Sequence, residues 1–125
     1  MSDLQPKGIP IMIGDVERHL LFTISVIDEV QAKYEKPLSS VMEMLQDDDK
    51  LVQVVFDLMF FMINDEIKRE RYFHHKEEEP MTEQELKWFL DYSHIGEYMG
   101  AILRAYGVSL PEAEDDSPNA ESRSD

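Results

Sequence analysis

The side chains that could do acid–base or metal chemistry in this chain are 27 Asp and Glu residues and four His, because cysteine is absent. Without cysteine, disulfides, thiolate zinc sites and a cysteine nucleophile are excluded. His74 and His75 are adjacent in the sequence, so their side chains diverge on any regular backbone, and no HExxH-like ligand spacing occurs. No pair of carboxylates has a spacing diagnostic of general acid–base catalysis. The sequence therefore predicts a protein that is not an enzyme and that binds no metal or cofactor.

The run Asp47-Asp48-Asp49 is the densest group of possible calcium ligands in the first half of the chain. Counted from Asp47, position six of a calcium loop is Val52 and position twelve is Leu58, where Gly and Glu are required. We expect instead that Asp48 or Asp49 caps the helix that follows, and that the other acids complement its dipole. The nucleophile elbow, the phosphate-binding glycine loop and the dinucleotide fingerprint are also missing.

The charge of the chain points away from nucleic acid. With a formal net charge of -15, its surface should repel phosphates rather than bind them. Residues 112–125 hold six acids and one Arg with few apolar side chains, so we expect a disordered acidic tail there and a flexible N-terminus over residues 1–8. Residues 9–111 are left as a single helical domain with an N-terminal hairpin. The start of the chain has no apolar signal region, and the longest apolar run is too short for a membrane span, so we expect neither secretion nor a membrane.

Alternation of apolar residues predicts a β-hairpin at the start of this domain. Ile9, Ile11 and Ile13 alternate along the first arm, and Gly14-Asp15 can supply the positive φ angles that a two-residue hairpin turn requires. From residue 24 onward the spacing becomes helical. The sequence predicts helices after Thr23, after Pro37, from about residue 49 to about residue 72, after Thr82, and from residue 94 to a terminator at Gly107. Thr82 and Glu85 form a capping box. The predicted fold is mainly α, a hairpin packed on a bundle of about four to five helices.

The long helix is apolar almost all round, since only Gln53 and Asp57 are polar between residues 51 and 63. At 100° per residue, Gln53, Asp57 and Asn64 share one narrow stripe, and Phe60 falls on that stripe. One interpretation is a central helix covered by neighbours on every side. The other is a docking groove for a partner helix or a sister subunit. The second interpretation assigns partner binding to four residues of this helix: Val52, Phe56, Phe60 and Ile63.

Two glycines of the last helix add a further candidate. Gly96 and Gly100 lie one turn apart, and each interior glycine costs about 1 kcal/mol relative to alanine. A close crossing by another helix would offset that cost. We expect this crossing to be intramolecular, and we retain Gly96 and Gly100 as partner-binding candidates.

The order of these elements resembles the tail assembly chaperones of long-tailed bacteriophages, particularly those of phages and prophages of Gram-positive hosts. The stretches "IPIMIGDVERHLLFT", "ISVIDEVQAKYEKPLSSVMEML" and "MTEQELKWFLDY", with "HIGEYMGAILRAYGVSLPE" after them, carry the resemblance. It rests on pattern and order over residues 8–112. The chain departs from the family in its long central helix, extended by "IKRERYFHHKEEE", and in the less acidic spacing around residues 26–29.

The resemblance implies a non-enzymatic role. Such chaperones coat the tape measure protein and keep it soluble while tail tube subunits polymerise around it, and a frameshifted longer product recruits the tube protein in many phages. They act in the cytoplasm of the infected or lysogenic host and are absent from the mature virion. The implied partners are thus the tape measure protein and possibly the tail tube protein, with a homo-oligomer expected. The alternatives are an acidic DNA-mimic or anti-host inhibitor and, third, a structural virion component.

Overall fold

The computed structural model describes residues 8–110, which form a two-stranded antiparallel hairpin packed against five α-helices and two short 3₁₀ helices. The predicted fold class is confirmed. The elements in chain order are β1 (Ile9–Ile13), β2 (Val16–Leu20), α1 (Ile24–Tyr34), α2 (Leu38–Glu43), η1 (Met44–Gln46), α3 (Leu51–His74), α4 (Glu83–Phe89), η2 (Tyr92–His94) and α5 (Ile95–Ser109). The predicted acidic tail, and all but the last residue of the predicted flexible N-terminus, lie outside the described residues.

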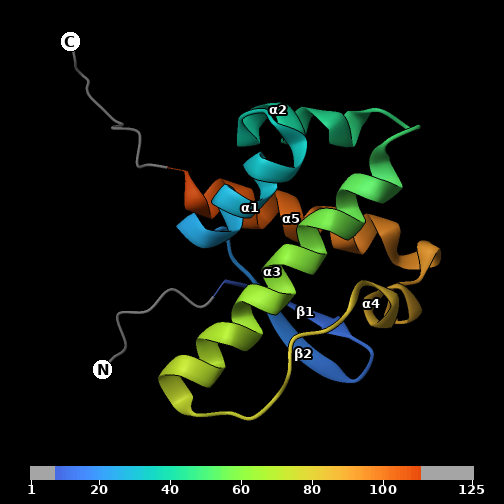
Figure 1. The fold of residues 1–125 in the computed structure, drawn as a ribbon. Helices are drawn as coiled ribbons and strands as arrows, with labels where there is room; N and C mark the ends of the chain where they lie inside the picture. Colours follow the sequence, from blue (N-terminus) through green and yellow to red (C-terminus); the bar gives the residue numbers. More distant parts are fainter. Residues whose placement is uncertain (1–7, 111–125) are drawn as a thin grey trace.

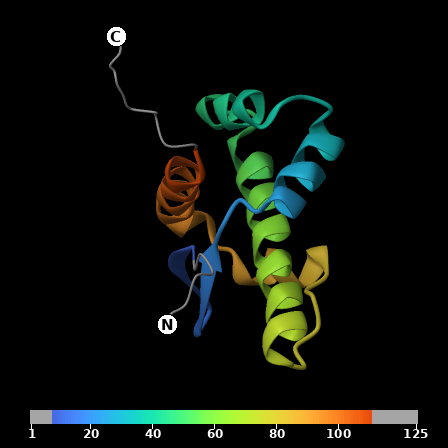
Figure 2. The same ribbon diagram turned by 90° about the vertical axis from the view of Figure 1, so that its left-hand side faces the viewer.

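Helix α3 runs through the middle of the molecule (Figure 1). In the second view it lies between α1 on one side and α5 with the hairpin on the other, while α2 crosses above its N-terminal end (Figure 2). From Val54 to Ile67 every side chain of α3 is buried except Phe60 and Phe61, which are partly buried. The interpretation of a central helix covered on every side is therefore correct for this part of α3.

The hairpin forms as its turn residues predict. Gly14 has φ +65°, a conformation that L side chains rarely adopt, and the register pairs Ile13 with Val16 on either side of the turn. Leu20, at the far end of β2, is fully buried, and Ile13 beside the turn is also buried, so the hairpin packs on the body at both ends.

Three of the predicted helix boundaries can be compared with the structure. The capping box of α4 is present, with Thr82 and Glu85 bonded to each other's backbone. The predicted cap of α3 by Asp48 or Asp49 is wrong: Lys50 occupies the cap position without a side-chain bond, and Asp47 instead accepts from the Asp49 amide at 3.0 Å. The predicted terminator Gly107 is also wrong, because α5 continues through it to Ser109.

Candidate binding groove

Four buried polar side chains of α3, which we call the polar anchors, join this helix to its neighbours. They are Asp57, Asn64, Asp65 and Glu66, and they are 3%, 7%, 7% and 8% exposed. Because a buried polar group is costly without hydrogen bonds, each of these side chains needs partners. The partners identify what each anchor does.

Asp57 fastens α1 to α3. It accepts hydrogen bonds from Lys33 Nζ at 3.1 Å and from the Tyr34 hydroxyl at 2.5 Å, and Gln53 donates to it at 2.9 Å. Burial of Tyr34, and its hydrogen bond to the Asp57 carboxylate, raise the pKa of the phenol well above its usual value. Asp57 is therefore a structural acceptor that three donors satisfy.

The other anchors hold the start of α1, the hairpin and the loop before α4. Thr23 Oγ1 donates to Asp65 at 3.0 Å, and the His19 amide donates to Glu66 at 2.9 Å, with the His19 ring Nδ1 a further 2.7 Å contact. The side chain of Asn64 bonds both the N–H and the C=O of Met81, at 2.7 and 2.9 Å.

These bonds occupy the carboxylates that would otherwise be the first candidates for chemistry. Within residues 8–110, no group of three or more His, Asp or Glu side chains is placed to hold a metal ion.

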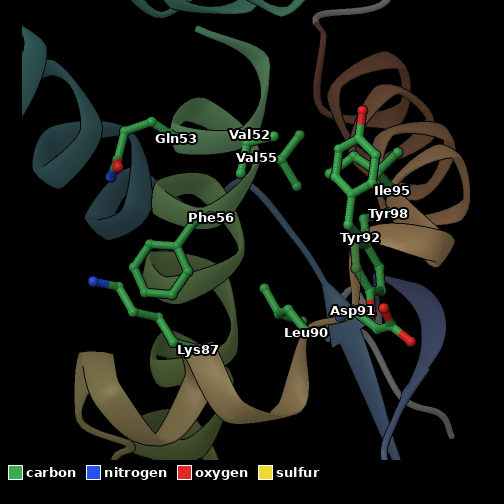
Figure 3. A pocket seen from close by; sticks show the side chains of 10 residues that line it. All are labelled: Val52, Gln53, Val55, Phe56, Lys87, Leu90, Asp91, Tyr92, Ile95 and Tyr98. Atoms are coloured by element: carbon green, nitrogen blue, oxygen red, sulfur yellow. Dashed lines mark hydrogen bonds between the residues drawn. The ribbon is translucent and has the colours of Figure 1, made fainter.

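A groove of about 310 Å³ opens between the N-terminal half of α3 and the segment that joins α4 to α5 (Figure 3). Its lining is mostly aliphatic and aromatic, with a few polar side chains among them. The lining residues are Val52, Gln53, Val55, Phe56, Lys87, Leu90, Asp91, Tyr92, Ile95 and Tyr98. Within this set, Gln53 points away toward α1, so the interior is largely apolar (Figure 3).

The groove exists because the chain leaves α4 in an extended conformation. Leu90 and Asp91 both have extended backbones, with ψ near 130° (132° and 129°). The Asp91 amide donates to the Tyr98 hydroxyl at 3.0 Å, which fixes this connection against α5. Helix α4 is thereby held beside Phe56, and the first turn of α3 is left uncovered, with Val52 51% exposed.

Two opposite charges mark the rim of the groove. Lys87 Nζ lies 5.6 Å from the centroid of the Phe56 ring, within the range of a cation–π contact. At Asp91, the hydrogen bond from Ser93 lowers the pKa of the carboxyl group, so this group stays ionised. An apolar interior with one positive and one negative group at its rim is suited to binding apolar side chains of a partner.

The four predicted docking residues of α3 separate in the structure. Val52 and Phe56 line the groove, although Phe56 is only 8% exposed. Phe60 is partly buried and stacks on Phe56 with ring centroids 5.9 Å apart, outside the groove lining. Ile63 is 1% exposed and lies in the core, so the prediction that it faces a partner is wrong for this conformation.

The error has a clear physical cause. In the sequence, Asp57 and Asn64 share one stripe with Phe60, and the docking interpretation requires this region of the helix to be open to a partner. The structure covers this stripe with α1 and with the loop before α4, which supply the polar partners described above. The open surface of α3 lies instead around Val52, in its first turn.

Gly96 and Gly100 do not lie at an intramolecular helix crossing. A Cβ atom on Gly96 would have no neighbour within 4 Å, and one on Gly100 would meet only Arg104 Nη1, at 3.5 Å. The predicted tight crossing is wrong because this face of α5 points away from the core. Both glycines line a second hollow, of about 440 Å³, between α5 and β1.

Of the ten groove residues, only Val52 and Phe56 were predicted as docking residues; the eight that were missed include Leu90, Tyr92, Ile95 and Tyr98. The signal that could have found Leu90 and Tyr92 is the apolar and aromatic run "WFLDY", which spans the end of a helix of only seven residues. Trp88, Phe89 and Tyr92 in this run are 76%, 50% and 69% exposed. Such a concentration of exposed aromatic side chains is typical of an interaction surface.

Comparison of the chain with protein-family models finds no match, and neither do comparisons with curated proteins and with solved structures. Among residues 8–110, no helix is both long and apolar enough to cross a membrane.

Proposed function

We propose that this protein is a non-enzymatic tail assembly chaperone of a long-tailed bacteriophage or prophage, which binds and solubilises the tape measure protein during tail tube assembly. The observation that carries the proposal is the apolar groove between α3 and the connection from α4 to α5. The resemblance in element order, from the hairpin to the last helix, supports the same role.

The groove is suited to an apolar helical segment. An amphipathic helix binds such a site through apolar side chains spaced three, four or seven residues apart, which insert along its length. Val52, Leu90 and Tyr92 would contact these side chains, and Lys87 and Asp91 would pair with charges beside them. The polar anchors support this role because they fix α3, so that little conformational entropy is lost when the groove is filled.

The charge of the chain supports a solubilising role. A long helical tape measure protein exposes apolar surface before the tube encloses it, and such surface promotes aggregation. A small protein with a net charge of -15 that covers this surface lends the complex a large negative charge. Like-charged complexes repel one another and stay dispersed.

The proposal places the protein in the cytoplasm of the infected or lysogenic host and outside the mature virion. Its partners are the tape measure protein and possibly the tail tube protein. Detection of this chain in purified particles would favour a structural virion component instead.

The test is co-expression with the tape measure protein of the same phage or prophage genome. We expect the wild-type chain to raise the soluble fraction of that protein and to co-purify with it. Val52→Glu should abolish both effects, because it places a charge in the groove without disturbing a buried side chain. Ile24→Glu is the matched control, since Ile24 is 79% exposed on α1, outside the groove lining. The proposal would be refuted if both variants lost co-purification of the tape measure protein equally, or if the wild type did not capture that protein.

The excess of acids keeps the DNA-mimic inhibitor as a second candidate, and salt separates the two. A complex held by carboxylates on a basic nucleic-acid site weakens steeply as ionic strength rises. A complex held by apolar side chains in the groove should keep most of its affinity when salt is raised about tenfold. A steep loss with salt, together with an unchanged Val52→Glu complex, would support the mimic.

A further inference from the structure

In the described part of the chain, the outer edge of β1 is paired with no other strand. Ile13 and Val16 flank a two-residue turn and form a hydrogen-bonded pair, and such pairs alternate with non-bonded ones along an antiparallel ladder. Met12 and Pro10 belong to the non-bonded pairs, so their backbone groups point away from β2. Because proline has no N–H, this edge offers the N–H of Met12 and the C=O groups of Met12 and Pro10.

The equivalent edge of β2 is already covered. His19, which is in register with Pro10, points its N–H outward and donates it to Glu66 of α3 at 2.9 Å. This bond agrees with the alternation, and the second view shows β2 between β1 and α3 (Figure 2). Among residues 8–110, the Met12 N–H has no such acceptor. An unpaired strand edge is a template to which an extended segment of another chain can add.

The hollow of about 440 Å³ between α5 and β1 lies along this free edge. Pro10 and Met12 point to one face of the strand and Ile11 points to the other. All three line the hollow, and a space at the edge of the strand is the one that reaches both faces. On the opposite wall, Gly96 and Gly100 present no side chains, so a second backbone can approach α5 closely. The hollow therefore has room for an extended chain beside β1.

The two ends of the hollow carry opposite charges. Phe22, which follows β2, packs edge to face on Tyr106 with ring centroids 6.1 Å apart, so the C-terminal half of α5 lies beside the open end of the hairpin. Arg104 belongs to that end of the hollow, whereas Glu97, two turns earlier on α5, and Glu17, near the hairpin turn, belong to the other end. Within residues 8–110, Arg104 pairs with no carboxylate, so its charge is available.

We propose that an extended segment of another protein adds to the outer edge of β1 as an antiparallel third strand, with an apolar side chain toward Gly100 and with a basic residue that precedes an acidic one. An antiparallel pairing is slightly more stable per residue than a parallel one. In this direction the segment runs from the Glu17 end of the hollow to the Arg104 end, so charge complementarity requires the basic residue first.

Strand geometry gives the spacing of the segment. A residue opposite Ile11 points to the same face as Ile11, so an apolar side chain there enters the hollow. Charged residues two positions before and two positions after it share this face and lie about 13 Å apart. Glu97 and Arg104 are about 10.5 Å apart along the axis of α5, and long charged side chains accommodate the difference.

This surface is distinct from the groove, because the two linings share no residue. The inference therefore goes beyond the chaperone proposal and does not depend on it. Val52→Glu, which should abolish binding in the groove, should leave binding at β1 unchanged.

The test uses the peptide Thr-Lys-Thr-Val-Thr-Glu-Thr, acetylated and amidated at its ends, added to the isotopically labelled full chain and followed by NMR. In the free protein the Met12 N–H should exchange with solvent faster than those of Ile11 and Ile13, which bond β2. The peptide should shift the Met12 amide resonance saturably and slow its exchange. No shift at about 5 mM peptide would overturn the proposal. Slow exchange at Met12 without peptide would also overturn it, because a second copy or another segment of this chain would then occupy the edge.

Backbone methylation of the peptide distinguishes strand addition from simple apolar contact. The Thr before Val lies opposite Met12, so a methyl group on its backbone nitrogen removes an N–H that faces β1 and should abolish binding. A methyl group on the nitrogen of Val, which points away from β1, should be tolerated. Equal effects of the two methyl groups would overturn the proposal.

Met12→Pro removes the corresponding N–H from the protein and should weaken binding about fivefold or more, whereas Met12→Val keeps that N–H and is the matched control. Equal weakening in the two variants would assign the effect to the side chain and overturn the proposal. Arg104→Glu should weaken the original peptide by a similar factor and should prefer a peptide with Lys in place of Glu. Failure of this exchange of charges would contradict the proposed direction of the strand.

Gly100→Leu gives a steric test. The subunit should stay folded, because a Cβ atom at Gly100 meets only the end of the Arg104 side chain, but the new side chain fills the hollow and should abolish peptide binding. Gly107→Leu is the matched control, since Gly107 lies on the same helix with no neighbour within 4 Å of its Cβ position and outside the hollow. Equal loss in the two variants, or loss in Val52→Glu, would overturn the proposal.

Discussion

The part of α3 around Asp65 and Glu66 and the first turn of α3 around Val52 belong to one continuous helix but differ in what covers them. Around Asp65 and Glu66, specific hydrogen bonds from Thr23 and His19 hold α1 and the hairpin in place. Around Val52 a groove separates α3 from the segment that joins α4 to α5, and apolar side chains remain in contact with solvent.

This difference separates stability from binding. A buried carboxylate with several donors is costly to disturb, because removal of the carboxylate leaves all its donors unpaired in a medium of low dielectric. A half-exposed apolar side chain such as Val52 contributes little to folding but remains available to a partner. Substitutions in these two parts of α3 should therefore change different measurements.

The largest effect is expected within the enclosed part of α3. Leu58 is fully buried, so Leu58→Ala should lower the free energy of unfolding by about 2–5 kcal/mol through lost burial and a residual cavity. Urea unfolding followed by circular dichroism measures this. A loss below about 1 kcal/mol would mean that α3 is less tightly enclosed than the structure describes.

The polar anchors come next. Asn64→Ala removes both hydrogen bonds to Met81 and leaves the N–H and C=O of this partly buried residue unpaired, so we expect a loss of about 2–3 kcal/mol. Asn64→Asp keeps the acceptor for the Met81 N–H and should lose less. If both variants unfold like the wild type, the anchors do not fasten the loop before α4, and the contrast between the enclosed part of α3 and its first turn fails.

Phe60 is intermediate between the buried Leu58 and the exposed Val52, since it is partly buried and stacks on the groove residue Phe56. Phe60→Ala should cost about 1–3 kcal/mol, less than Leu58→Ala, because solvent already reaches part of the ring. Capture of the tape measure protein should weaken, but less than with Val52→Glu, since Phe60 acts on the groove through Phe56. Unfolding as severe as that of Leu58→Ala would make Phe60 an ordinary core residue.

The smallest effect is expected at Tyr34 and depends on pH. Because its pKa is raised in the folded protein, the neutral phenol is stabilised by folding, and this contribution is complete below the ordinary pKa of 10.0. It is lost as the pH rises further, so the wild type should lose stability in that range. Tyr34→Phe should cost about 1 kcal/mol at neutral pH and should show a shallower alkaline decline. If the stability of the wild type and of Tyr34→Phe falls equally with rising pH, Tyr34 is not the group responsible for the alkaline loss of stability.

Much of the fold could be predicted from the sequence because the signals are local. The hairpin turn needs only the backbone freedom of Gly14, which does adopt a positive φ angle. The start of α4 needs only the reciprocal bonds between Thr82 and Glu85. The apolar composition of residues 51–63 likewise requires a helix that other elements cover.

Side-chain exposure could be predicted less well, because it depends on which elements meet. Ile24 fits the apolar periodicity of α1, yet it is 79% exposed, while Val26 is fully buried. Asp57 and Asn64 look like a solvated stripe in the sequence, but α1 and the loop before α4 carry the donors and acceptors that make their burial favourable. The position of the groove also lay beyond local reasoning, since it results from the extended path of Leu90 and Asp91 beside a distant turn of α3.

The sequence by itself determined that this protein is mainly helical, begins with a hairpin, is strongly acidic and contains one helix too apolar to stand alone. Each of these follows from composition, periodicity or the chemistry of a few consecutive residues. Only the tertiary structure decided which apolar residues remain open: Val52 and Tyr92 rather than Ile63. It likewise decided that Gly96 and Gly100 face outward. The physical reason is that a side chain is buried only where a second surface packs against it, and residues far apart in the chain supply that second surface.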